Sequence, residues 1–229
     1  MRAFITIISL GLVFTLHAQN NIGNNGVRQP STPSGGMQIG VPVGEFNSTW
    51  GKGLFGLSAN IAFPMRRIPI HFGYDFGWAR MGGETMLPAS SGGIFGGNTG
   101  TKVEVNSNVY DHLGLLRLDP SKGKVHPYGD FLIGVRHFST RSTAFTADES
   151  TASEKTSDVV SSMGWAAGVT MTISNNFFAD LRVERLYTGR VSYVDVSTIE
   201  IASDGTVTYE KLTSNADVIN FQLGVGFRF

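Results

Sequence analysis

The sequence predicts an all-β protein, a closed eight-stranded antiparallel transmembrane β-barrel. Apolar and polar residues alternate with a period of two through most of the chain after Gly35, as they do in β-strands. The polar positions mostly hold small residues rather than Lys and Glu, and short connections alternate with long ones. Small polar side chains suit a narrow interior, so the large apolar side chains are expected to face lipid.

Composition excludes several classes of protein. The chain has 229 residues, no cysteine, and 18 basic against 18 acidic residues. A disulfide scaffold, a cysteine-ligated metal site and a cysteine nucleophile are therefore excluded, and no basic footprint for nucleic acid is present. Beyond the first segment no stretch of about 18 apolar residues occurs, so membrane helices are also excluded. In hydrocarbon only helices and closed barrels satisfy every backbone group, which leaves the barrel.

The first segment is interpreted as an export signal. Met1 and Arg2 are followed by an apolar run up to Leu16, and Leu16-His17-Ala18 precedes Gln19. This pattern predicts a signal peptide over residues 1–18. Residues 19–34 are rich in Asn, Ser, Pro and Gly and predict a disordered periplasmic tail, which leaves 35–229 as the barrel domain.

Eight segments show the alternation. They are residues 37–43, 53–64, 70–78, 102–117, 130–136, 164–173, 177–184 and 218–229. The fourth is the least regular: Val103, Val105, Val109, Leu113 and Leu115 share its apolar face, which Ser107 and Asp111 interrupt.

The opposite faces give the expected interior. Its ionisable members are His71, Asp75, Glu104, His112, Asp130, Arg136, Asp180, Arg182, Glu184 and Arg228. Buried charges need partners, so acids are expected to pair with arginines across the lumen. An eight-stranded barrel is just wide enough for side chains to fill, which favours a static polar plug over an ion path.

The connections between the segments differ in length. Those at 64–69, 119–124 and 174–176 are short and turn-like, whereas those at 80–101, 141–157 and 194–216 are long and polar. Only the first loop, 45–51, is short for its side. Outer-membrane barrels have tight periplasmic turns at one rim and extended loops outside the cell at the other.

The chain resembles the small OmpA/OmpX-type outer-membrane β-barrel superfamily over about residues 35–229. The resemblance rests on the alternation, the loop asymmetry and the last strand, which ends in Phe229 after alternating apolar residues. It implies a Gram-negative-type bacterial source, a place in the cell outer membrane and contact with its lipids. It also implies that the barrel-assembly machinery recognises the segment from Ile219 to Phe229.

One short motif suggests an enzyme as an alternative. Arg136-His137-Phe138-Ser139 resembles the His-aromatic-Ser motif of the outer-membrane lipid A deacylases. His137 and Ser139 share the outward face of their strand, and the resemblance implies that His137 activates Ser139 at the lipid surface. Thr140 replaces the Asn of that family, and the candidate acids, Glu149 and Glu154, fall in the expected loop.

The remaining sequence features do not indicate a catalytic or ligand-binding site. An interfacial aromatic girdle is expected from Trp50, Trp78, Tyr128, Trp165, Phe177, Tyr187 and Phe229. The glycine-rich stretch 92–97 lacks the ending of a phosphate-binding loop, and the five histidines lack close metal-ligand spacing. We therefore expect no cofactor, no metal and no catalytic residue, in a protein with a structural, adhesion or binding role through its extracellular loops. The alternatives are the lipid A-modifying hydrolase and a narrow channel.

Overall fold

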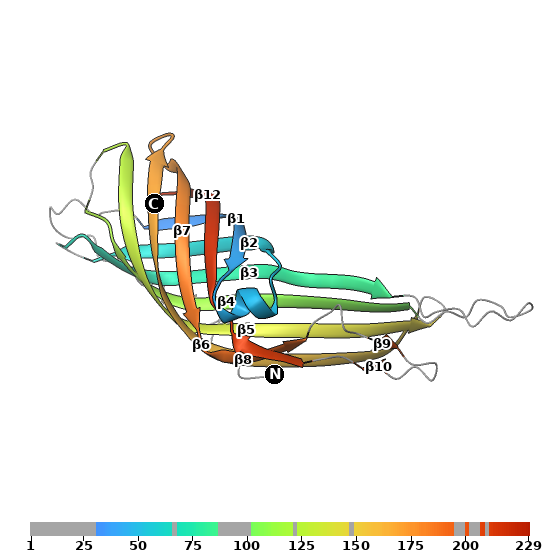
Figure 1. The fold of residues 1–229 in the computed structure, drawn as a ribbon. Coiled ribbons are helices and arrows are strands. Elements are labelled where there is room, and N and C mark those ends of the chain that lie inside the picture. The colour runs from blue at the N-terminus through green and yellow to red at the C-terminus, as the bar shows by residue number, and fades with distance from the viewer. Residues whose placement is uncertain are drawn as a thin grey trace, which may run out of the picture.

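The computed structural model contains the expected closed barrel (Figure 1). It describes residues 31–65, 68–86, 102–120, 123–146, 149–194, 200–201, 207–208 and 211–229. Eight antiparallel strands pair in the order β1-β12-β7-β6-β5-β4-β3-β2. Their bounds are β1 Thr32–Pro42, β2 Leu54–Pro64, β3 Ile70–Met86, β4 Lys102–Leu118, β5 Val125–Thr146, β6 Glu149–Thr172, β7 Phe177–Thr188 and β12 Val218–Phe227. The expected signal peptide and most of the expected tail lie outside the described residues.

The first and last strands close the barrel. Strand β1 pairs with both β2 and β12, so that Met37 is opposite Leu57 on one side and Leu223 on the other. Beside this seam the two described ends of the chain meet, because Ser31 N donates to Phe229 O at 3.0 Å and Phe229 N donates to Ser31 O at 3.3 Å. Each of the eight barrel strands therefore has two neighbours, as a membrane-spanning sheet requires.

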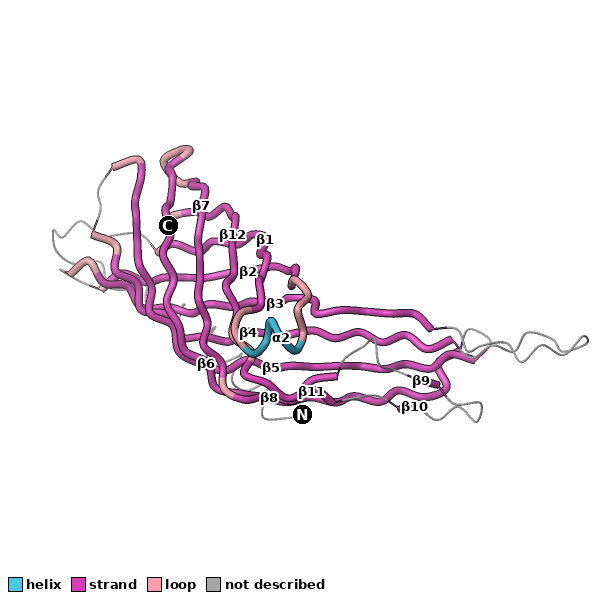
Figure 2. The backbone as a smooth tube through the Cα atoms, in the orientation of Figure 1, coloured by secondary structure: helices cyan, strands magenta, loops and turns pink. Residues whose placement is uncertain are grey.

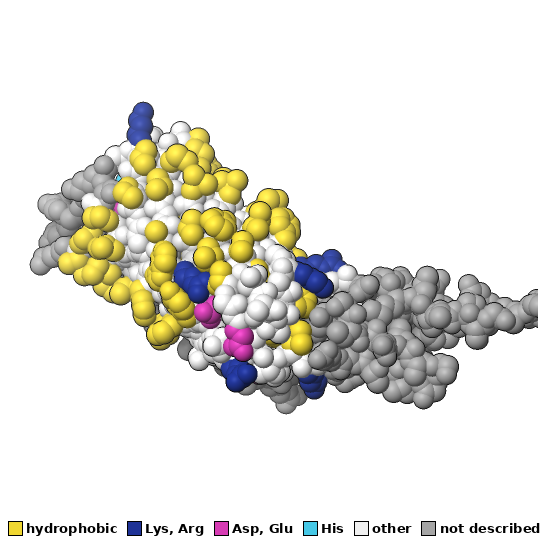
Figure 3. All heavy atoms as spheres, in the orientation of Figure 1, with side chains coloured by type: hydrophobic (Ala, Val, Ile, Leu, Met, Phe, Trp, Pro, Cys, Tyr) yellow, Lys and Arg dark blue, Asp and Glu magenta, His cyan; other side chains and the backbone are white. Residues whose placement is uncertain are grey.

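Large apolar side chains cover the outside of the wall, as expected for a surface in lipid. The exposed ones include Met37, Ile39, Leu57, Phe72, Phe131, Ile133, Trp165, Leu181, Phe221 and Leu223. In the space-filling view they spread over the barrel wall with few charges among them (Figure 3).

The facing of β4 corrects the expectation from the sequence. Its apolar face turns inward: Val109 and Leu113 are fully buried, while His112 and Glu104 lie on the outward face. The inward face also carries Asp111 and Arg117, which pair with charged residues in the lumen. Glycines on the neighbouring strands leave room for the leucines, because Leu115 is the register partner of Gly73 on β3 and Leu113 that of Gly134 on β5. The interior is therefore only partly polar. The sequence predicts that the more apolar face of each strand meets lipid, and for β4 this prediction is wrong.

Four strands are far longer than a membrane requires. Strands β3 and β4 have 17 residues each, β5 has 22 and β6 has 24, whereas about 9 to 11 residues cross the hydrocarbon. Most of the segment 141–157, expected as a loop, is paired strand, for example Arg141 with Lys155. The four strands continue side by side past the barrel on one side of the view (Figures 1 and 2).

The same end of the barrel carries the remaining elements. Helix α2 (Glu45–Thr49) connects β1 to β2, and β8 (Arg190–Val194) pairs with β11 (Lys211–Asn215). Between them β9 (Glu200–Ile201) pairs with β10 (Val207–Thr208). The Tyr193 ring packs 5.5 Å from Phe46, 5.9 Å from Trp50 and 6.3 Å from the inward-facing Phe138. These aromatic side chains cover the interior at this end. No helix in the described part of the chain is long and apolar enough to cross a membrane.

Candidate functional site

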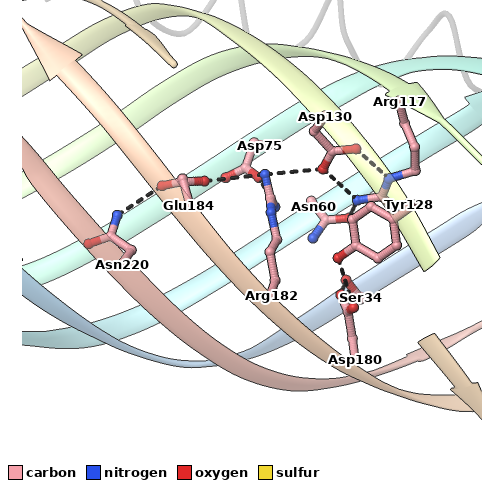
Figure 4. Close-up of polar contacts among 10 residues, drawn as sticks. All are labelled: Ser34, Asn60, Asp75, Arg117, Tyr128, Asp130, Asp180, Arg182, Glu184 and Asn220. Carbon is pink, nitrogen blue, oxygen red and sulfur yellow. Dashed lines mark hydrogen bonds and ion pairs between the residues drawn. The ribbon is translucent and has the colours of Figure 1, made fainter. Parts of the chain in front are cut away.

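A network of buried charges lies in the lumen (Figure 4). Arg117 on β4 donates from Nε to Asp130 Oδ1 at 2.8 Å and from Nη2 to Asp130 Oδ2 at 3.0 Å. This two-pronged contact is the strongest geometry for an arginine and a carboxylate. Arg117 Nη2 also donates to Asn60 Oδ1 at 3.3 Å, which ties β2 to β4 across the interior.

Arg182 on β7 is the centre of the network. Its guanidinium forms ion pairs with Asp75, with Asp130 at 3.3 Å and with Glu184 at 3.2 Å. Asn220 Nδ2 donates to Glu184 Oε1 at 2.8 Å, so β12 joins the same network. All five side chains are buried. One cation from β7 thus compensates carboxylates from β3, β5 and β7.

Tyr128 extends the network toward the periplasmic turns. Its hydroxyl donates to Asp180 Oδ1 at 2.8 Å, and the guanidinium carbon of Arg117 lies 3.9 Å from the centre of its ring. Ser34 Oγ donates to the other oxygen of Asp180 at 3.2 Å. Gly168, opposite Tyr128 on β6, makes room for the ring, because a Cβ at that glycine would lie 2.4 Å from the tyrosine oxygen.

A third buried arginine, Arg136, lies in the outer part of the barrel. Arg136 Nε donates to Asp111 Oδ1 at 2.6 Å, and its Nη1 donates to Ala216 O at 2.6 Å and to Thr188 Oγ1 at 3.1 Å. The expected pairing of acids with arginines across the lumen is therefore confirmed. Sequence reasoning missed Arg117 and placed Asp111 on the wrong face of β4.

Apolar side chains fill the space between these charges. One cluster includes Leu54, Leu113, Leu132, Leu186 and Val218, and it continues to Phe46, Trp50 and Tyr193 at the outer end. Packed aliphatic side chains leave little room for water, so the lumen has the character of a plug.

Two of the expected girdle residues lie elsewhere. Trp50 and Tyr128 are each only 6% exposed and face the interior. Trp165, Phe177, Tyr187 and Phe229 are 46–59% exposed on the outside, where a girdle is expected. Trp50 directly follows helix α2, and Tyr128 lies near the start of β5. The Tyr128 hydroxyl finds a partner inside the barrel, Asp180, whereas the buried Trp50 Nε1 has no hydrogen-bond partner among the described residues.

The structure places His137 and Ser139 on the outward face of β5, as expected. The His137 ring stacks on Tyr110 of β4, with 5.8 Å between ring centres. Within the described residues, no hydrogen bond joins His137 to Ser139 or to a carboxylate. Residues 149 and 154 lie in β6, but their side chains are outside the described part. Among the described side chains there is thus neither an activated serine nor an orienting acid at this position.

A small pocket lies at the outer end, between β6 and the β8–β11 pair. Its lining residues are Thr156, Ser157, Asp158, Ser192, Tyr193 and Lys211. Asp158 Oδ2 accepts a hydrogen bond from Ser192 N at 3.0 Å, which fixes β8 against β6. In the described part of the chain, no group of three or more His, Asp or Glu side chains is arranged to hold a metal.

Comparison with known proteins decides the family. A model of the outer membrane protein β-barrel domain matches residues 6–229, almost the whole chain. The chain belongs to this family. This match confirms the predicted resemblance to small outer-membrane barrels. It also confirms the predicted place in a Gram-negative cell envelope. A search of the curated proteins finds no match.

Solved structures share the fold at low sequence identity. Ail, the attachment invasion locus protein of Yersinia pestis, in complex with the heparin analogue sucrose octasulfate, matches with a TM-score of 0.51 at 16% identity, covering 89% of this chain and all of Ail. Ail in a second structure gives 0.49 at 16% identity over the same shares. Neisserial surface protein A gives 0.42 at 12% identity, covering 87% of this chain and 97% of that protein. These likenesses concern the fold alone.

Proposed function

We propose that this outer-membrane barrel is an adhesion or binding protein that contacts a partner outside the cell through the sheet extended from β3–β6. The observation that carries the proposal is the length of β5 and β6, 22 and 24 residues. About half of each strand suffices to cross the membrane. The remainder is a paired sheet held clear of the lipid, and a rigid scaffold is a suitable base for a binding surface.

The interior supports the same proposal. Buried arginine–carboxylate pairs and the apolar cluster occupy the lumen. Trp50 and Tyr193 pack over it at the outer end. A filled barrel offers no path for a solute, so function is expected at the surface. Ail, which shares the fold, is by name an attachment protein and was crystallised with a heparin analogue.

The test removes the outer part of the β5–β6 hairpin. Ser142 and Glu154 are paired, so replacing residues 142–154 by Asn-Gly keeps the strand register and closes the hairpin with a favoured turn. Bacteria displaying the full chain are expected to adhere to surfaces coated with glycans or matrix proteins at least fivefold more than bacteria displaying the shortened chain.

The control is the fold of the shortened chain. Its barrel is expected to migrate faster on a gel before boiling than after, like the parent. Equal adhesion by the two chains and by cells lacking the protein, over the whole panel of coatings, contradicts the proposal.

A further inference from the structure

The connection between β1 and β2 closes one side of the outer end of the barrel. We call its residues 44–51, which contain helix α2, the flap. Two of its side chains, Phe46 and Trp50, are buried, and their rings lie 5.5 and 5.9 Å from the ring of Tyr193 on β8. Asn47 and Ser48, on the other face of the helix, are exposed. The flap therefore covers part of the apolar cluster of the interior.

The indole N–H of Trp50 is buried without an acceptor. Its Nε1 has no hydrogen-bond partner among the described residues. Buried donors are nearly always paired, and an unpaired one is unfavourable. The Tyr193 ring meets the indole edge to face, and an aromatic ring is only a weak acceptor. The position of Trp50 in the structure thus suits its ring and not its polar atom.

An indole turned outward from the flap would find acceptors. The last outward side chains of β1 and β2 before the flap are Val41 and Phe55, which are 44% and 56% exposed, so hydrocarbon reaches the ends of both strands. The flap begins three residues after Val41 and ends four before Phe55, at the level of the head groups. Tryptophan is enriched at this boundary because its ring is apolar and its N–H is polar.

Glycines at both ends of the flap can serve as hinges. Gly44, the N-cap of α2, has a φ of 61°, and Gly51, just beyond the helix, has a φ of 64°. Both values lie in the left-handed region, which glycine adopts without steric cost. No side chain caps the helix at Gly44, and a Cβ there would meet no atom within 4 Å. Hinges are a few such residues that absorb a change in backbone angles.

The polar contacts between the flap and the β8–β11 pair are exposed. Glu45 Oε2 accepts a hydrogen bond from Asn215 N at 3.1 Å, and Glu45 Oε1 lies 3.8 Å from Arg190 Nη2. We call these two contacts of Glu45 the latch. Exposed ion pairs contribute little to stability. A weak latch and a buried unpaired donor keep the free energy needed to lift the flap small.

We propose that the flap is a hinged lid with two positions. In the closed position, which the structure shows, Phe46 and Trp50 pack beneath Tyr193. In the open position the flap turns about its two glycines, Trp50 lies among the lipid head groups, and the apolar surface around Tyr193 faces the outside of the cell. The closed position predominates because it buries two aromatic side chains. Opening creates no pore, since the deeper apolar cluster and the buried ion pairs stay packed. The lid thus controls whether a partner outside the cell meets a polar or an apolar surface.

Fluorescence of Trp50 tests the position of the flap. The chain has three tryptophans, so W78F/W165F leaves Trp50 as the only one. The purified chain is reconstituted in phosphatidylcholine nanodiscs that contain a lipid with a nitroxide quencher on its head group. We expect the quencher to reach a minor fraction of Trp50, and a fraction at least threefold larger in E45A, which removes the latch. The matched control is S48A, which removes a hydrogen bond within α2, from Ser48 Oγ to Glu45 O, and is expected to behave like the parent.

Thiol labelling tests whether the whole flap lifts. Ser214 of β11, the strand against which α2 packs, is fully buried. The chain has no cysteine, so S214C supplies a single thiol. A water-soluble thiol reagent is expected to label it at least threefold faster when E45A is also present, and at an unchanged rate with S48A. Unboiled gels check that the barrel stays folded in each variant.

Three results overturn the proposal. Equal quenching of Trp50 in the parent and in E45A means that the flap does not open, with W50F/W78F as the positive control because its remaining Trp165 faces lipid. An equal rise in E45A and S48A assigns the effect to fraying of the helix. Quenching of Trp50 without labelling of S214C means that the indole moves alone.

Discussion

Arg182 lies fully buried among Asp75, Asp130 and Glu184, and it is the only cation in contact with Asp75 among the described ion pairs. Replacing it by Gln leaves Asp75 and Glu184 without a cation among the described ion pairs, whereas Asp130 keeps Arg117. Breaking a buried ion pair on one side costs about 3–5 kcal/mol. We expect R182Q to lower the free energy of unfolding by that amount, measured by urea titration in detergent micelles.

The control for this prediction is R185Q. Arg185 pairs with Asp217 at the partly exposed rim, where an ion pair contributes about 1 kcal/mol or less. A loss of stability as small in R182Q as in R185Q would show that the interior network does not hold the barrel together.

Replacing Ser139 by Ala tests the hydrolase alternative, because it removes the hydroxyl that would act as the nucleophile. Because His137 stacks on Tyr110 and has no hydrogen bond to Ser139, we expect no acyl transfer or hydrolysis at this position. Lipid A from cells expressing the parent chain and S139A is expected to have identical mass spectra. A lipid A species that lacks an acyl chain only when Ser139 is present would restore the enzyme.

At the scale of single strands, the sequence predicts most facings but not that of β4. Period two reports which residues share a face, and it does so for β4 as well. Which face turns inward depends on the charged partners and the space that the other strands offer inside the barrel. Inside the lumen Asp111 pairs with Arg136 and Arg117 pairs with Asp130. Gly134 of β5, the register partner of Leu113, leaves room for the leucine. The two ion pairs join register partners of the β4–β5 hairpin, 25 and 13 positions apart, so they depend on the strand pairing, which the alternation alone does not reveal.

The extended hairpin of β5 and β6 was predicted as a loop for a related reason. Its residues beyond Ser139 are mostly Ser, Thr and charged residues, and outside the lipid both faces of the sheet meet water. The alternation that marks a membrane strand then disappears, although Thr favours strands. Helix α2 was likewise predicted only as a short loop.

The last strand carries a prediction of its own. The sequence resemblance implies that the assembly machinery recognises the segment from Ile219 to Phe229. Phe229 is 58% exposed and packs on Phe227 at 5.5 Å between ring centres, so its loss removes little from the core. F229S is expected to lower folded barrel in the outer membrane severalfold in cells, measured on unboiled gels.

Refolding of the purified chain into detergent separates recognition from stability. There F229S is expected to match the parent. An equal loss in cells and in detergent would mean that Phe229 stabilises the barrel itself, which contradicts a role in recognition.

For the whole molecule, the filled lumen predicts that the protein does not conduct ions across a membrane. Single-channel recordings in planar bilayers are expected to show no conductance steps from the parent chain. D130N is expected to be silent as well, because the aromatic cover of Phe46, Trp50 and Tyr193 remains in place. Regular steps that disappear when the protein is boiled would favour the narrow channel.

The barrel as a whole could be predicted from sequence because its rules are local: strand alternation, short turns and the need to pair every backbone group in lipid. The cover of its outer end could not. It depends on Tyr193 meeting Phe46 and Trp50 across most of the chain.

The proposed function requires that the β3–β6 extension stands outside the cell. The chain has no cysteine, so single substitutions T143C on the extension and K124C in the β4–β5 turn give clean labelling sites. Intact cells are treated with a membrane-impermeant thiol reagent. We predict that T143C is labelled at once and K124C only after the outer membrane is permeabilised. Labelling of K124C but not T143C in intact cells would contradict the account.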